Sequence, residues 1–285
     1  YDEVMLGHHP EVDVPYLPSR VEKRVRTLLK GLDFKWSYPE HPGRLSAIME
    51  LLEKEPIPGV QFKAGAHATY EQLGRVHTTT HLDHIFSLEG KRAWLRILIV
   101  DWDAHHGNGT QDIFWADPDV LFFDIHCAAP FYPGSGDLEE VGAGLGEGYT
   151  VNVPVPEDAG DIAFEKAFRE ILVPAAERFE PDLVLVSAGF DPHRNDMALN
   201  LTYDGFAVLT RMLQDIADRH CDGRLALVLE GGYNLTSLSR GVHTVLEVLA
   251  GGDVPELAEC GLREVVQAAE FHRDAFTDDE EAEED

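Results

Sequence analysis

Short apolar runs alternate with helical patterns over the last two thirds of the chain, and this alternation restricts the fold more than any other feature. The apolar runs lie at 96–103, 120–126, 149–155, 182–187 and 224–230. Apolar residues recur with helical spacing at 44–55, 162–179, 204–220 and 235–249. Strands that are apolar on both faces belong to parallel sheets covered by helices. The sequence therefore predicts an α/β fold, a single three-layer domain with a mainly parallel sheet and helices on both faces.

The chain ends in a run of acidic residues. Seven of the eight residues at 278–285 are Asp or Glu, and such a run is typically solvated and disordered. We therefore expect the folded domain to span 1–277. Further helical segments are expected at 20–30, which is basic, and at 70–88.

Net charge limits the partners that this protein can bind. Lys and Arg number 23 and Asp and Glu 52, for a net charge of −29, which argues against binding nucleic acid through a basic face. Basic ligands such as lysine-rich tails or polyamines would be attracted instead. Strong acidity with few lysines is typical of adaptation to high salt, where screening weakens self-repulsion. An ordinary acidic cytoplasmic protein is the alternative.

Cysteine content and hydropathy favour a soluble protein in a reducing compartment such as the cytoplasm. The three cysteines, Cys127, Cys221 and Cys260, have no CxxC spacing, which argues against a disulfide framework or a cysteine zinc site. No apolar run reaches the roughly 18 residues of a membrane helix. The first residues have neither the basic nor the apolar region of a signal peptide.

Ionisable side chains are densest in the segment DWDAHHGNG at 101–109, directly after an apolar run. Because side chains alternate along a strand, Asp101, Asp103 and His105 are expected to point the same way. Two carboxylates and an imidazole on one face would demand a cation. The pattern therefore predicts a divalent metal site.

Two other predicted strands also end in polar residues. Asp191 follows one of them in SAGFD, and Tyr233 follows another in LEGGYN. In open α/β sheets, ligands bind beyond the carboxyl ends of the strands. Asp103, His105 and Asp191 would fill three positions on a catalytic zinc and leave one open; these ligand types also suit Fe²⁺. Tyr233 could then donate a hydrogen bond to a developing oxyanion.

These motifs, with FYPGSG at 131–136 and GYTVNVPVP at 148–156, resemble the zinc-dependent histone deacetylase superfamily. That superfamily includes acetylpolyamine amidohydrolases and acetoin-utilisation proteins. The resemblance covers about 96–250, with a weaker match at 44–89, and Asn108 resembles the class II-like branch. It implies an arginase/deacetylase-like fold.

The resemblance also implies roles for individual residues. Asp103, His105 and Asp191 would be the zinc ligands, and Tyr233 would stabilise the transition state. Gly232 would lie beside the acetyl-lysine channel, and Tyr132 would form part of its wall. Asp101 and Asp124, with the backbone carbonyls of Asp103 and His105, resemble a structural potassium site.

One part of the family pattern is missing from its expected place. The family carries Gly-His-His and Gly-Phe-Cys motifs before the zinc strand, and its histidine pair includes the general base. Here neither motif is found there, and several dozen residues are absent at the Leu95–Arg96 junction. The printed chain could omit a segment, the protein could have lost it and be inactive, or another histidine could substitute. The candidates are His8, His9 and His193.

The expected reaction is zinc-dependent hydrolysis of an N-acetyl amide, with an acetyl-lysine protein or an acetylpolyamine as substrate. One alternative is a dinuclear manganese hydrolase similar to arginase, which would need more bridging carboxylates. Another is a zinc-binding or acetyl-lysine-binding protein without turnover, or an acidic interaction module. The sequence leaves the oligomeric state open.

Overall fold

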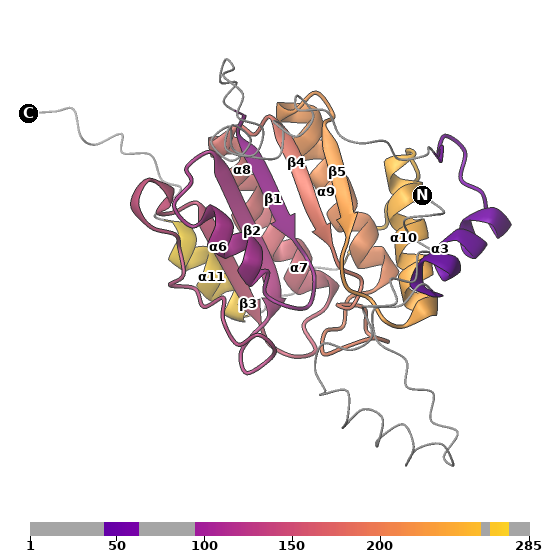
Figure 1. Ribbon diagram of the computed structural model, residues 1–285, viewed down its shortest axis with the longest axis horizontal. Coiled ribbons are helices and arrows are strands. Elements are labelled where there is room, and N and C mark those ends of the chain that lie inside the picture. The colour runs from indigo at the N-terminus through magenta and orange to yellow at the C-terminus, as the bar shows by residue number, and fades with distance from the viewer. Residues whose placement is uncertain (1–42, 63–94, 258–262, 274–285) are drawn as a thin grey trace, which may run out of the picture.

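All five predicted strands are present and form one parallel sheet. The computed structural model describes residues 43–62, 95–257 and 263–273. The strands run in the order β3-β2-β1-β4-β5 (Figure 1). Their bounds differ from the predicted ones by at most two residues: β1 (Ile97–Asp101), β2 (Val120–Cys127), β3 (Thr150–Val155), β4 (Leu183–Ala188) and β5 (Leu225–Leu229). The segments 20–30, 70–88 and 278–285, and the candidate bases His8 and His9, lie outside the described residues.

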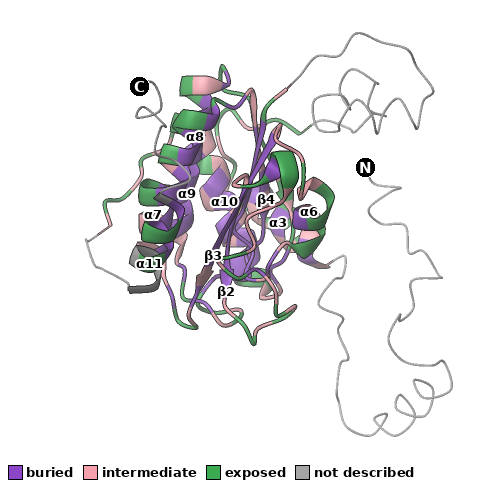
Figure 2. Cartoon of the chain, turned by 90° about the vertical axis from the view of Figure 1, so that its left-hand side faces the viewer, coloured by how far each residue is buried: buried purple, intermediate pink, exposed green. Residues whose placement is uncertain are grey.

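Helices cover the sheet on both faces, as the fold class predicted. Figure 2 shows α7, α8, α9 and α11 together on one side of the sheet and α6 on the other. Helix α10 packs against both α9 and α3. Among the described helices, none is long and apolar enough to cross a bilayer. The bounds are α3 (Gly43–Lys54), α6 (Asn108–Phe114), α7 (Asp161–Ala167), α8 (Val173–Phe179), α9 (Tyr203–His220), α10 (Leu235–Leu249) and α11 (Arg263–Arg273).

The helix predicted at 162–179 is divided by one wide turn. A π-helical segment, Phe168–Leu172, separates α7 from α8, and the Val173 amide donates to the Phe168 carbonyl. Pro174 follows at the start of α8. Proline has no amide hydrogen and its ring crowds the preceding turn of a regular helix. A wider turn just before Pro174 relieves that crowding.

Strand β1 is buried on both faces. Leu98 and Val100 belong to the main hydrophobic core, whereas Ile97 and Ile99 belong to a smaller cluster with Val120 and Phe122. This alternation places the main core between the sheet and the helices α7–α9. A strand embedded in this way is a rigid support for the residues at its carboxyl end.

Core packing predicts a large stability difference between two substitutions. Phe123 on β2 is fully buried and meets Phe168 edge to face, with ring centroids 5.5 Å apart. We expect Phe123→Ala to lower the free energy of unfolding by about 3–5 kcal/mol. Ile113 on α6 is 75% exposed, so Ile113→Ala should change it by less than about 0.5 kcal/mol. Urea unfolding measures both, and equal losses would contradict this core assignment.

Candidate metal centre

The order of the strands creates a topological switch point between β1 and β4. The chain passes from β1 through β2 to β3 on one side of β1, and then continues with β4 and β5 on the other side. The connections beyond the carboxyl ends of β1 and β4 therefore lead away in opposite directions. Such a switch point is where open α/β sheets bind ligands. Asp103 and His105 follow β1, and Asp191 follows β4.

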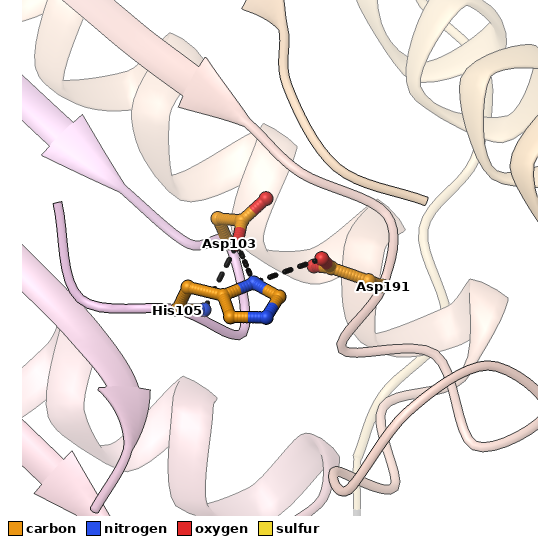
Figure 3. A group of neighbouring side chains, drawn as sticks. All are labelled: Asp103, His105 and Asp191. Atoms are coloured by element: carbon orange, nitrogen blue, oxygen red, sulfur yellow. Dashed lines mark hydrogen bonds and ion pairs between the residues drawn. The ribbon is translucent and has the colours of Figure 1, made fainter. Parts of the chain in front are cut away.

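Asp103, His105 and Asp191 point toward one another beyond the carboxyl ends of these strands (Figure 3). His105 Nδ1 lies 2.9 Å from Asp103 Oδ1 and 3.2 Å from Asp191 Oδ2. One potential ligand atom from each residue lies within 4.8 Å of the others. The structure thus brings together the three residues that the sequence proposed as metal ligands.

The surroundings of the triad favour a positive charge. The hydrogen bond to Asp103 and the contact with Asp191 raise the pKa of His105 to about 10. Burial raises the pKa of Asp191 to about 6, although the contact with His105 lowers it. Each carboxylate is buried, so an ionised pair is costly unless a cation is close by.

The carboxylate oxygens of the triad fit a metal ion. Asp191 Oδ2 is buried, and among the described residues it has no hydrogen-bond partner besides the 3.2 Å contact with His105 Nδ1. Gly189 and Gly231 leave room around the carboxylates, because a Cβ atom at Gly189 would clash with Asp103 and one at Gly231 with both Asp103 and Asp191. Two carboxylates and one imidazole leave an open position on a zinc ion. The residues present therefore fit the group that the sequence predicted.

Asp101 lies apart from this group, contrary to the expectation from side-chain alternation. Strand β1 ends at Asp101, and the chain bends directly afterwards. Asp101 Oδ1 accepts the Asp103 amide at 3.0 Å. Asp103 and His105 lie together as expected, but the strand ends at Asp101, and Asp101 is not part of the group of potential metal ligands.

Asp101 is instead beside Asp124, its register partner on β2. Asp124 Oδ2 accepts the Gly107 amide at 2.7 Å, and a Cβ atom at Gly107 would crowd the carboxylates of both Asp101 and Asp124. Burial and the neighbouring charge of Asp124 raise the pKa of Asp101 well above its usual range. A cation between these two carboxylates would offset that repulsion.

Tyr233 and Gly232 lie in a loop that is hydrogen-bonded to the proposed metal ligand Asp103 and to the residue before Asp191. The Gly231 amide donates to Asp103 Oδ2 at 2.8 Å, and the Phe190 amide donates to the Gly231 carbonyl at 3.0 Å. Gly232 has a φ of +114°, which a residue with a side chain rarely adopts. The loop after β5 therefore brings Tyr233 to the same end of the sheet as the triad.

Arg44 is a functional candidate that the sequence alone missed. Its side chain is buried; Nε donates to the Gly232 carbonyl at 2.6 Å, and a second nitrogen donates to the Glu230 carbonyl. The guanidinium lies 5.3 Å from the centre of the Tyr233 ring. An Arg on a predicted helix gives no sign of a partner 188 residues away.

Aromatic side chains border the triad on the β2 side. Phe131 stacks on His105 with ring centroids 5.0 Å apart, and Tyr132 meets His105 at 6.3 Å. Tyr132 is 76% exposed. The sequence pointed to Tyr132 but missed Phe131.

His193 has the surroundings of a packing residue. It is 1% exposed, stacks on Tyr203 at 4.5 Å and accepts the Asn195 amide at Nδ1. His106 is also buried, between Ser135 and Gln111. These contacts give neither imidazole an evident role as a base at the triad.

Comparisons with known proteins found chains that are similar to this one. A family model described as the histone deacetylase domain matches residues 85–249. Histone deacetylase 14, chloroplastic, from Arabidopsis thaliana is 46% identical over 160 residues, which cover 55% of this chain and 38% of that protein. A probable deacetylase from Archaeoglobus fulgidus is 44% identical over 172 residues, covering 59% of this chain and 48% of that protein. The chain thus spans less than half the length of either relative.

Solved structures show the same fold. The crystal structure of the HDA15 HD domain superposes with a TM-score of 0.68 and 28% sequence identity, covering 86% of this chain and 90% of that chain. The structure of the histone deacetylase Clr3 gives a TM-score of 0.68 and 27% identity, covering 88% of this chain and 56% of that chain.

Loss of one carboxylate should abolish metal binding. We expect the unaltered protein to retain about one zinc ion per chain after dialysis, and Asp191→Ala to retain almost none, because it removes a buried ligand. Asp112→Ala, at an exposed position on α6, is the matched control and should bind zinc normally. Elemental analysis measures the ratio. Full zinc occupancy in Asp191→Ala would rule out the triad as the metal site.

Proposed function

The chain belongs to the histone deacetylase superfamily, with class II-like motifs, and we propose that it is a metal-dependent deacetylase that hydrolyses N-acetyl amides. The convergence of Asp103, His105 and Asp191 at the switch point carries this proposal. The family match supports the reaction class, and the glycine-bordered carboxylates support a bound zinc ion. Fe²⁺ would suit the same ligands.

Each group at the site would have a distinct part in the reaction. When bound, zinc supplies Lewis-acid polarisation and lowers the pKa of a water molecule toward about 7. Tyr233 donates its hydroxyl hydrogen to the oxyanion that develops from the acetyl carbonyl. Tyr132 forms part of the channel wall at the mouth of the site, and Gly232 lies beside the channel. The proposal assigns no described residue as the general base.

The proposed substrate is an acetylated lysine in a protein or an acetylated polyamine. Lysine-rich tails and polyamines are cationic apart from the acetylated nitrogen, and the net charge of −29 would attract them. The same charge disfavours direct nucleic-acid binding. Buried, unpaired thiols at Cys127 and Cys221 suit a reducing compartment such as the cytoplasm.

A mononuclear site is favoured over an arginase-like dinuclear one. Within the described part of the chain, one cluster of potential ligands was found, and it consists of three residues. Two metal ions would need further bridging carboxylates. A zinc-binding protein without turnover remains the second candidate, because the Gly-His-His motif is missing from its expected position.

Turnover by the zinc-loaded protein tests the proposed reaction. We expect hydrolysis of an acetyl-lysine peptide or of N-acetylspermidine, and none with Asp191→Ala. Tyr233→Phe should lower kcat by about 10²–10³-fold, because it removes an oxyanion donor, while zinc binding is unchanged. Tyr149→Phe, before β3 at the opposite end of the sheet, is the control. Stoichiometric zinc without turnover on either substrate would favour the inactive alternative.

We also propose that Asp101 and Asp124 hold a structural potassium ion. Replacing KCl with tetramethylammonium chloride at equal ionic strength should lower Tm, because the larger ion cannot enter between the carboxylates. At a potassium concentration of 100 times Kd, binding would add about 2.7 kcal/mol to the free energy of unfolding. The difference between the two salts should disappear in Asp124→Asn. An equal Tm in both salts would contradict potassium binding.

A further inference from the structure

The carboxylate of Asp196 binds the main chain of Tyr233. Asp196 Oδ2 accepts the Tyr233 amide at 2.8 Å and the Asn234 amide at 2.7 Å. Hydrogen bonds to an ionised carboxylate are about twice as strong as those between neutral groups. Two adjacent amides held by one oxygen restrict both the position and the orientation of the peptide between them.

Asp196 belongs to the connection that begins with the metal ligand Asp191. Within this connection, the Met197 amide donates to the Asp191 carbonyl at 3.3 Å and the Asp196 amide donates to the His193 carbonyl at 2.8 Å. Asn234 Nδ2 also donates to the Asn195 carbonyl at 3.1 Å. The segment that supplies a metal ligand therefore also holds the segment that supplies Tyr233.

The loop before Tyr233 needs such support because of its composition. Gly231 and Gly232 have no side chains, and glycine explores more backbone conformations than any other residue. Asp103 fixes the Gly231 amide and Arg44 fixes the Gly232 carbonyl. Asp196 supplies two further anchors, at the residue that carries the hydroxyl and at the one after it.

We propose that Asp196 is a positioning residue that fixes the Tyr233 backbone, and through it the Tyr233 hydroxyl, relative to Asp103, His105 and Asp191. The proposal rests on the oxyanion role proposed above for Tyr233. A displacement of about 1 Å can cost about 10²-fold in rate. We therefore expect Asp196→Ala to lower kcat by about 10–10²-fold, with KM and zinc content nearly unchanged. Asp196→Asn keeps one acceptor oxygen and should restore part of the rate.

A purely structural role makes a different prediction. Asp196 lies next to the start of α10, where Asn234 is the N-cap, and a carboxylate near a helix N-terminus stabilises the helix. Loss of that contribution would lower Tm without acting through Tyr233. Thr202→Ala is the matched control: it removes the N-cap of α9, which accepts the Gly205 amide, and should lower Tm while leaving kcat unchanged.

A double-mutant cycle separates the two roles. Asp196→Ala is measured in the unaltered protein and in Tyr233→Phe, using the full zinc-loaded chain. If Asp196 acts through the hydroxyl, its substitution should lower kcat by about 10–10²-fold with Tyr233 present and by less than about threefold with Phe. Equal fold-losses in both backgrounds would overturn the proposal. If Asp196→Ala does not fold, Asp196→Asn provides the same comparison with smaller expected values.

A binding measurement tests the role of Asp196 without requiring turnover of a substrate. A peptidyl trifluoromethyl ketone forms a hydrate that imitates the tetrahedral intermediate, and calorimetry gives its Kd for the same four proteins. We expect Asp196→Ala to weaken binding at least fivefold in the unaltered protein and hardly at all in Tyr233→Phe. Absence of turnover would refute the reaction, whereas an additive cycle in Kd would refute the role of Asp196.

Discussion

The concentration of buried negative charge at the switch point is the constraint on which the site depends. Asp103 and Asp191 come from neighbouring strands and lie buried around the Nδ1 atom of His105. Carboxylates are costly to bury unless they are hydrogen-bonded or paired with a positive charge. In this structure the imidazole partly meets that requirement, and Asp191 Oδ2 has no hydrogen-bond partner among the described residues besides its contact with His105. The site is thus electrostatically suited to a cation.

The same two carboxylates also join the loops around the site. Asp103 accepts the Gly231 amide with one oxygen, and Asp191 Oδ1 accepts the Ala104 amide at 2.9 Å. These bonds connect the carboxyl ends of β1, β4 and β5. Because the proposed metal ligands also organise the backbone, their geometry and the placement of Tyr233 are coupled. Removing one carboxylate would therefore weaken metal binding and also the hydrogen bonds that hold the loops around the site.

Local sequence patterns predicted the strands of the sheet and the proposed metal ligands. Apolar runs marked all five strands, and acidic residues directly after them marked Asp103 and Asp191. Arg44, Phe131 and Asp196 could not be found in this way. Arg44 contacts carbonyls 186 and 188 residues away, and Asp196 contacts amides 37 and 38 residues away. Nothing in the neighbouring sequence distinguishes such residues from ordinary surface charges.

By itself, the sequence determined the parallel α/β fold, the family and the strand ends that carry ionisable groups. Those properties follow from hydrophobic periodicity and short motifs, which are local along the chain. Only the tertiary structure decided which carboxylates share a site: Asp103 lies with Asp191, whereas Asp101 lies with Asp124. The bend after β1 and the lateral order of the strands decide this division, and both depend on packing between segments that are distant in sequence.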